Sequence, residues 1–185
     1  MRKLIFSINT TIDGCVDHTL GTPDDEMMAY FTRLTREADT LVYGRKTYEL
    51  MVPYWPDVAK TREGDKADVE FAEAFDAVEK IIVFSRTLTL PEGGKATIAR
   101  NSLSEEILKL KQQPGKNIFT GGVNLPRQMA ELDLIDEYHF VVHPTIAGKG
   151  VRMFDGIDLP KILRLKLAES VAFKSGCLAL RYVKE

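Results

Sequence analysis

Apolar runs alternate with amphipathic segments over most of the chain, which predicts interleaved strands and helices. Buried strands are expected at 3–8, 40–43, 80–84, 118–119 and 137–143, with a short edge strand at 97–99. Helices are expected from residues 23, 44, 103 and 125, and over 67–78. Two last strands, 165–173 and 177–183, should form a hairpin. The pattern predicts an α/β fold, with a mostly parallel sheet flanked by helices and an antiparallel hairpin at its end.

The first expected helix begins shortly after the first strand. Thr22 is its expected N-cap, Pro23 takes its first helical position, and residues 24–26 add acidic groups to its first turn. Its apolar face consists of residues at helical spacing, which are Met27, Tyr30, Phe31, Leu34 and Ala38. The start of this helix is therefore expected to border the same cleft as Asn9 and Thr10, which lie at the end of the first strand.

A glycine pair after the strand at 118–119 is the most informative turn. The chain passes there from strand to helix through Thr120, Gly121, Gly122, Val123, Asn124 and Leu125. Glycine lets an anion approach the backbone closely, and the first N–H groups of a helix are free to bind it. The run therefore indicates a phosphate site, and the alternative is a plain strand-to-helix turn that binds nothing.

A similar strand–glycine–helix turn occurs upstream. Gly44 ends a short strand, and Arg45, Lys46 and Thr47 open the next helix. Cations at the start of a helix oppose its dipole, an arrangement that makes sense where a bound anion lies among them. We therefore favour a second phosphate site here over a pair of solvated surface cations.

Two further features lie near these turns in the expected fold. Ser85 and Arg86 follow the strand at 80–84, at the edge where ligands bind in open α/β sheets. They suit a further phosphate, such as the one on the ribose of NADP, or are simply a turn residue and a solvated cation. Residues 52–66 hold Trp55 between prolines, and form either a lid over a substrate or a loop packed on the surface.

Composition excludes several classes of protein but does not indicate a function. The 185 residues, 44% hydrophobic and 28% charged, suit one domain with a sizeable core. A formal net charge of -2 provides no basic field for nucleic acid, and no apolar run is long enough to span a membrane. Ser7 interrupts the first apolar run too early for a signal peptide. We therefore expect a cytoplasmic protein in which Cys15 and Cys177 are free thiols.

Two histidines share one face of the strand at 137–143. His139 and His143 are four residues apart, too far along a strand for easy chelation, and neither a cysteine nor a carboxylate completes a zinc pattern. We interpret them as structural groups or as support for a nearby site, and we expect no metal.

Five motifs in this order resemble the dihydrofolate-reductase fold, in the branch of the C-terminal reductase domain of bifunctional riboflavin-biosynthesis proteins. They are Thr-Ile-Asp-Gly at 11–14, Tyr-Gly-Arg-Lys-Thr-Tyr-Glu at 43–49, Phe-Ser-Arg at 84–86, Thr-Gly-Gly-Val-Asn-Leu at 120–125, and His-Pro-Thr-Ile-Ala-Gly-Lys-Gly at 143–150. The last run is similar to one in the riboflavin branch that dihydrofolate reductases lack. The resemblance covers nearly the whole chain and implies a three-layer sandwich in one reductase domain over 1–185.

This resemblance implies hydride transfer from NADPH to a small heterocyclic or ribosylamino-pyrimidine substrate. The two glycine turns would hold the cofactor's phosphates, with Ser85 and Arg86 at the ribose phosphate. Asn9 and Thr10 would approach the nicotinamide. The alternatives are a true dihydrofolate or pterin reductase, and a nucleotide-binding module without catalysis.

The proton that completes the reduction has several candidate sources. Asp13, Asp25 or an ordered water would supply it, although Asp13 also suits a turn residue that binds local backbone N–H groups. No carboxylate of the first helix aligns with the acid of dihydrofolate reductases. Phe31 and Trp55 are expected to contact the substrate, and the apolar terminal hairpin favours a homodimer.

Overall fold

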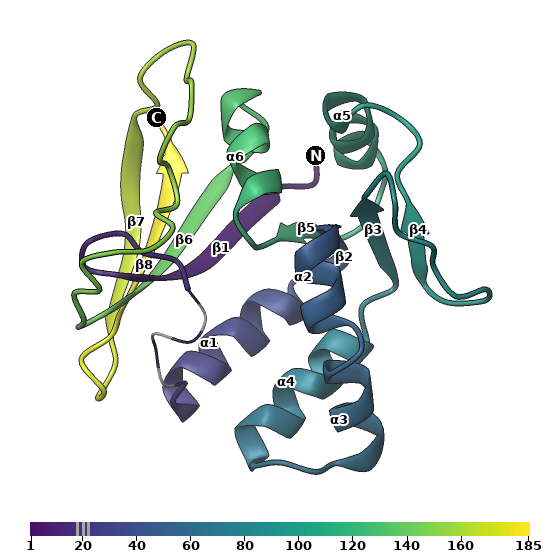
Figure 1. Cartoon of the computed structure of the whole chain (residues 1–185), viewed down its shortest axis with the longest axis horizontal. Coiled ribbons are helices and arrows are strands. Elements are labelled where there is room, and N and C mark those ends of the chain that lie inside the picture. The colour runs from purple at the N-terminus through teal and green to yellow at the C-terminus, as the bar shows by residue number, and fades with distance from the viewer. Residues whose placement is uncertain (18, 20, 22) are drawn as a thin grey trace.

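Strand β1 (Leu4–Thr11) lies inside the sheet of the structure, a computed structural model that describes residues 1–17, 19, 21 and 23–185. The sheet has eight strands in the order β4-β3-β2-β5-β1-β6-β8-β7 (Figure 1). The remaining strands are β2 (Ala38–Gly44), β3 (Lys80–Phe84), β4 (Ala96–Ile98), β5 (Asn117–Thr120), β6 (Glu137–His143), β7 (Leu165–Ala172) and β8 (Leu178–Lys184). The described helices are α1 (Asp25–Arg36), α2 (Arg45–Met51), α3 (Trp55–Thr61), α4 (Lys66–Asp76), α5 (Leu103–Gln112) and α6 (Asn124–Glu131).

Most neighbouring strands are parallel. β1 pairs in parallel with β5 and β6, and β2 pairs in parallel with β3 and β5. β8 pairs antiparallel with both β6 and β7, so the C-terminal hairpin extends one side of the sheet. The expected α/β fold with a mostly parallel sheet and a terminal hairpin is confirmed.

Alternating side chains build a core on each face of the sheet. Ile5 packs in one core with residues of α1 and α4, whereas Leu4 and Phe6 pack in the other with residues of α5 and α6. The same alternation places Leu41 in the first core and Val42 in the second. Figure 1 shows the resulting three layers, with α1 and α4 on one side of the sheet and α5 and α6 on the other. This period of two is the one expected for strands buried on both faces.

Helix α1 begins later than its sequence pattern indicates. Asp24 is the N-cap, and its carboxylate accepts the N–H of Met27 at 2.7 Å. The prediction that Pro23 occupies the first helical position is therefore wrong, because an aspartate beside it both caps the helix and places a negative charge at its N-terminus. The predicted cap, Thr22, lies outside the described residues. Ala38 belongs to β2 rather than to the helix. Within α1, the buried residues of the expected apolar face are Met27, Tyr30 and Leu34.

Residues 52–66, expected to be irregular, contain helix α3. Pro56 lies in its first turn, where a helical N–H has no intrahelical partner and proline is tolerated. The Trp55 ring packs edge-on against Phe71 of α4, with 4.6 Å between ring centroids. The prolines therefore mark the start of a helix, and the aromatic side chain anchors that helix to α4. None of the described helices is long and apolar enough to cross a membrane.

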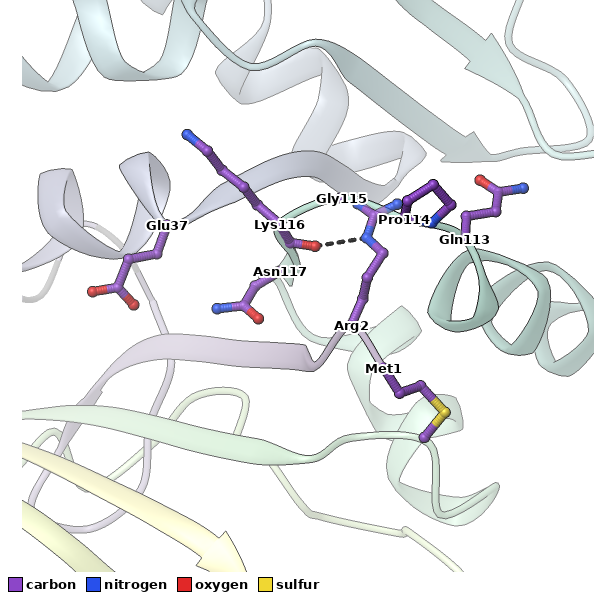
Figure 2. A pocket seen from close by; sticks show the side chains of 8 residues that line it. All are labelled: Met1, Arg2, Glu37, Gln113, Pro114, Gly115, Lys116 and Asn117. Atoms are coloured by element: carbon purple, nitrogen blue, oxygen red, sulfur yellow. Dashed lines mark hydrogen bonds between the residues drawn. The ribbon is translucent and has the colours of Figure 1, made fainter.

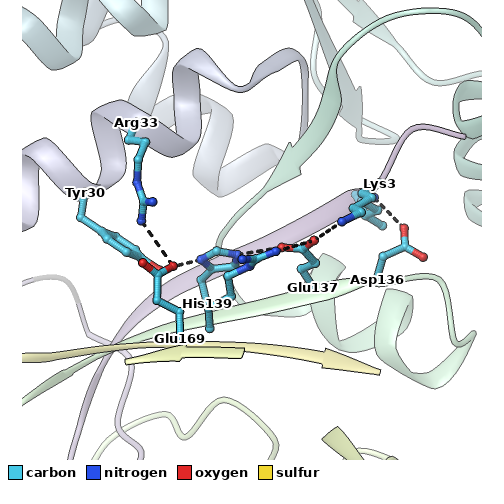
Figure 3. Close-up of polar contacts among 9 residues, drawn as sticks. Lys3, Tyr30, Arg33, Asp136, Glu137, His139 and Glu169 are labelled. Carbon is cyan, nitrogen blue, oxygen red and sulfur yellow. Dashed lines mark hydrogen bonds and ion pairs between the residues drawn. The ribbon is translucent and has the colours of Figure 1, made fainter. Parts of the chain in front are cut away.

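A buried charge cluster ties α1 to the sheet (Figure 3). Glu137 of β6 is 4% exposed, and its carboxylate accepts hydrogen bonds from Lys3 at 2.6 Å and from Arg181 at 2.8 Å. Its neighbour on the same face, His139, has Nδ1 2.6 Å from the hydroxyl of Tyr30 in α1. Each buried charge in the cluster is paired, which is the condition under which burial is tolerated.

We expect the free energy of unfolding to fall in two steps on acidification. Burial lowers the pKa of both His139 and His143 below 6.5, so the unfolded state binds protons first and stability is lost as the pH falls below that value. Burial alone would raise the pKa of Glu137, but hydrogen bonds from Arg181 and Lys3 lower it from 4.5 to about 2. Stability from Glu137 is therefore present above pH 4.5 and is lost as the pH falls toward 2. This second step should lower the free energy of unfolding by about 3 kcal/mol.

Urea unfolding across this pH range checks both steps. Glu137→Gln should flatten the lower step and leave the step near the histidine range in place. An unfolding free energy that stays constant down to about pH 5 would contradict the burial of two neutral imidazoles.

Candidate functional site

The carboxyl ends of the parallel strands meet at one edge of the sheet, and both glycine turns lie there. The first glycine turn, 44–47, follows β2, and the second glycine turn, 121–124, follows β5. β2 and β5 are hydrogen-bonded neighbours, with Val42 opposite Thr120. The fold therefore places side by side two turns that are far apart in sequence.

Direct packing joins the two turns. Gly122 has a φ of +86°, and a Cβ at this position would overlap the Thr47 side-chain oxygen. An added Cβ at Gly44 would lie 3.7 Å from the Leu125 Cβ. On the other side, a Cβ at Gly121 would lie 3.4 Å from the carbonyl oxygen of Ser7 in β1. The glycines thus let the backbone of the second turn settle between α2 and β1, and a phosphate site at these turns stays a prediction.

The helices that start at these turns lack side-chain caps. Asp24, Asp65 and Ser102 cap α1, α4 and α5 with their own oxygens. Neither Gly44 before α2 nor Val123 before α6 provides such a bond. The first N–H groups of both helices therefore have no capping side chain and are available to an outside acceptor. Because α2 has only seven residues, its individual N–H groups would contribute more to the binding of an anion than its helix dipole would.

Arg45 links the first glycine turn to the end of β3. Its Nε donates to Glu49 at 2.7 Å, and its NH1 donates to the Thr87 hydroxyl at 2.9 Å. The Ser85 hydroxyl oxygen accepts the N–H groups of Thr87 and Leu88, at 3.3 Å and 3.0 Å. Ser85 is thus a turn residue, which is one of the two roles considered for it above. Its own hydroxyl hydrogen remains available as a donor.

The other cations of this edge face solvent. Lys46 and Arg86 are exposed, and Arg45 shares its charge with Glu49. The charge that opposes the α2 dipole is therefore partly met within the chain. A bound anion is therefore not required to balance all of the charge at the first turn, and the close packing of the two turns does not depend on one.

A small pocket lies at the end of β1, which we call the β1 pocket. Its volume is about 30 Å³, and its described lining consists of Asn9, Thr10, Thr11, Cys15, Asp17, Gly21, Pro23, Met27 and His143. The Oδ1 of Asn9 is buried and has no hydrogen-bond partner among the described residues. A buried amide oxygen left without a partner suits a ligand that donates a hydrogen bond. Asn9 and Thr10 line this pocket, and the approach of a nicotinamide to them stays a prediction.

Asp13 is committed to holding a neighbouring loop. Its carboxylate accepts hydrogen bonds from the Thr11 hydroxyl at 2.7 Å and from the N–H groups of Ala147 and Gly148 at 3.0 Å and 2.9 Å. Arg152 lies 3.5 Å away. These bonds, that of Thr11 foremost, hold the pKa of Asp13 well below its usual range. A carboxylate held in its ionised form is a poor source of protons, and Asp13 instead fixes the glycine loop at 144–150.

Three other expected site residues lie away from the β1 pocket. Asp25 is exposed at the first position of α1. Phe31 packs edge-on against Tyr30, and Trp55 packs on α4. None of the three lines the β1 pocket, so contact between Phe31 or Trp55 and a substrate stays a prediction.

Met27 lines the β1 pocket with Asn9 and Thr10, as expected for the start of the first helix. Sequence reasoning gave Cys15 no role, and it considered His143 only as a structural group or as support for a nearby site. Met27 was placed on the core-facing side of its helix, and His143 on the same strand face as His139. The strand pairing that sets Thr11 opposite His143 is the missing information, because it joins segments 132 residues apart. Both cysteines are buried and free.

A larger hollow, of about 500 Å³, lies at the opposite edge of the sheet (Figure 2). It is lined by Met1, Arg2, Glu37 and residues 113–117. The Arg2 guanidinium there donates hydrogen bonds to the Lys116 carbonyl, the Asp39 carboxylate and the Thr40 hydroxyl. Ligands of open α/β sheets bind at the carboxyl edge, so size alone does not make this hollow the functional site.

Known proteins are similar to this chain in sequence or in structure. The uncharacterized protein YyaP of Bacillus subtilis (strain 168) is 31% identical over 186 residues, covering 98% of this chain and 94% of that protein. A pyrimidine reductase-like protein from Corynebacterium diphtheriae is similar in structure, with a TM-score of 0.71 at 17% identity, covering 100% of this chain and 92% of that one.

A bifunctional protein contains a similar fold as one part of its length. It is the diaminohydroxyphosphoribosylaminopyrimidine deaminase/5-amino-6-(5-phosphoribosylamino)uracil reductase from Thermotoga maritima, with a TM-score of 0.68 at 17% identity. All of this chain and 57% of that chain are covered. The RibD C-terminal domain matches residues 2–179. This protein therefore belongs to the RibD C-terminal domain family, a family of reductase-like proteins.

Proposed function

We propose that this protein is an NADPH-dependent reductase that acts on a ribosylamino-pyrimidine or a related small heterocycle. The observation that supports the proposal is the packing of Gly122 against Thr47, which brings the two glycine turns into contact. Membership of the RibD C-terminal domain family supports a reductase. The substrate class follows the activity named for the Thermotoga maritima protein.

The chain's own groups suit the parts of a dinucleotide. Backbone N–H groups of the two turns and the Thr47 hydroxyl would bind the pyrophosphate. Arg45, Ser85 and Arg86 would bind the phosphate on the adenosine ribose. The unpartnered Asn9 Oδ1 would accept a hydrogen bond from the carboxamide of the nicotinamide. The cofactor, when bound, supplies the hydride, and the residues around it orient the substrate carbon and exclude water.

Cofactor binding tests the ribose-phosphate assignment. We expect the protein to bind NADPH at least tenfold more tightly than NADH, because the extra phosphate meets two guanidinium groups. Arg45→Ala and Arg86→Ala should each weaken NADPH binding by about tenfold and leave NADH binding unchanged. Arg36→Ala, an exposed arginine at the end of α1, is the matched control. Equal affinity for the two cofactors, unaltered by either variant, would remove the assignment.

Turnover tests the reductase itself. NADPH oxidation is followed with 5-amino-6-(5-phosphoribosylamino)uracil, dihydrofolate and dihydrobiopterin. We expect oxidation with the first of these. Oxidation with dihydrofolate alone would favour a folate reductase, and tight NADPH binding without any oxidation would favour a nucleotide-binding module.

A further inference from the structure

His143 places an imidazole in the β1 pocket. It is the last residue of β6 and lines the pocket together with Asn9, Thr10 and Met27. Its register partner in β1 is Thr11. The side chain is 7% exposed, so the imidazole is held by protein rather than by solvent.

Two neighbours fix the orientation of this ring. The Sγ of Cys177, at the start of the β8 side of the hairpin, lies 3.4 Å from Nδ1. Gly21 lies against the ring so closely that an added Cβ would overlap the imidazole. Because Nδ1 contacts the thiol, the proton that the ring exchanges with a ligand is assigned to Nε2.

The carboxylates around the pocket have other tasks. Asp13 holds the loop at 144–150, and Asp24 caps α1. Asp17 accepts hydrogen bonds from both the N–H and the hydroxyl of Thr19. The imidazole of His143 is therefore a better candidate than these carboxylates for a group that releases a proton near neutral pH.

We propose that His143 is the proton donor of the reduction, giving the proton on Nε2 to the substrate atom that gains an electron pair. This inference rests on the proposed function. A hydride from NADPH forms the new C–H bond at the carbon of a C=N or C=O group, and the π electrons of that group move to its nitrogen or oxygen. That atom takes the proton from Nε2, the imidazole becomes neutral, and water restores its proton. The products are NADP⁺ and the reduced substrate.

The surroundings of His143 set the pH range of this step. Burial lowers the pKa of His143, and the Asp24 carboxylate acts in the opposite direction. Among the described residues, the other titratable groups that face the pocket or the ring are Asp17 and Cys15 from the segment after β1, and Cys177 beside the ring. A donor with a lowered pKa is protonated at acid pH, so turnover should rise as the pH falls toward the pKa.

His143→Gln tests the donor by kinetics with NADPH and 5-amino-6-(5-phosphoribosylamino)uracil. We expect kcat to fall by about 100-fold and its acid-side rise to disappear, with NADPH affinity changed by less than about threefold. His139→Gln is the matched control, because His139 is a buried histidine on the same strand face that does not line the pocket. It should keep the wild-type pH profile.

Nitrogen NMR of the wild-type protein provides a measurement that does not depend on the folding of a variant. The chain has three histidines, so the imidazole signals are few enough to separate. We expect the His143 signals to titrate with the same midpoint as kcat, and to shift on addition of NADPH while those of His139 do not.

The outcomes separate the two claims. A wild-type enzyme whose His143→Gln variant keeps its kcat and pH profile would overturn the proton-donor role and leave the reductase standing. A His143 signal that does not titrate in the kinetic range would overturn it as well. A wild-type protein that binds no NADPH would overturn the proposed function, and the donor role with it.

Discussion

Replacing Gly122 by alanine is expected to weaken NADPH binding by about 100-fold. The new Cβ would overlap the Thr47 oxygen, so the Thr47 side chain must turn away from the place where the two turns meet. A hydrogen bond from that hydroxyl to a charged phosphate is worth about 1.5–3 kcal/mol. The backbone at φ +86° would also shift, because an L-residue disfavours the left-handed region, and would carry the N–H groups of the second turn with it.

Gly93→Ala is the control that separates the loss of NADPH binding in Gly122→Ala from the effect of backbone strain. Gly93 has a φ of +76° and no atom within 4 Å of an added Cβ, so alanine there imposes the same backbone cost away from the site. Both variants should lower the free energy of unfolding by about 1 kcal/mol, and Gly122→Ala alone should lose NADPH in a fluorescence titration. Thr47→Val should reproduce part of the loss without a new overlap. Unchanged NADPH affinity in Gly122→Ala would mean that the second turn does not bind the cofactor.

Replacing Glu137 by alanine is expected to lower the free energy of unfolding by about 3 kcal/mol. Its carboxylate pairs with Lys3 and Arg181, and its removal would leave these cations without their partner beside His139. The bond from His139 to Tyr30 ties α1 to β6, so the helix that carries Met27 to the β1 pocket should also loosen. For a chain of this size the melting temperature should drop by about 6–12 °C.

Glu73→Ala is the control for this effect. Glu73 pairs with Arg62 on the surface, where their side chains are 44% and 66% exposed, and such pairs contribute less than about 1 kcal/mol. Thermal and urea unfolding of the two variants should therefore differ clearly. If both lose the same small amount, the Glu137 cluster does not hold the layers together.

The elements that form the site were predictable because their signals are local. Each glycine turn is a short apolar run followed at once by glycine and a helix start, and the structure has α2 begin at Arg45 and α6 at Asn124. That the turns meet follows from parallel strands, whose carboxyl ends share one edge. The order of the strands, which makes β2 and β5 neighbours, was not predicted from the sequence.

The partners of individual side chains were not predictable in the same way. The sequence around Asp13 indicates a local turn residue. In the structure its carboxylate accepts hydrogen bonds from the N–H groups of Ala147 and Gly148, which lie 134 and 135 residues away. The contact of Cys177 with His143 likewise depends on how the hairpin folds back over β6. Such pairings arise from packing between layers, and a single sequence carries no periodic signal for them. The homodimer stays a prediction.

A crystal structure of the complex with NADPH tests the central claim most directly. We predict that the pyrophosphate lies between the first and second glycine turns, in contact with the backbone of both, and that the nicotinamide reaches Asn9 and Thr10. A cofactor bound at only one of these turns, or in the hollow at the opposite edge of the sheet, would contradict the account.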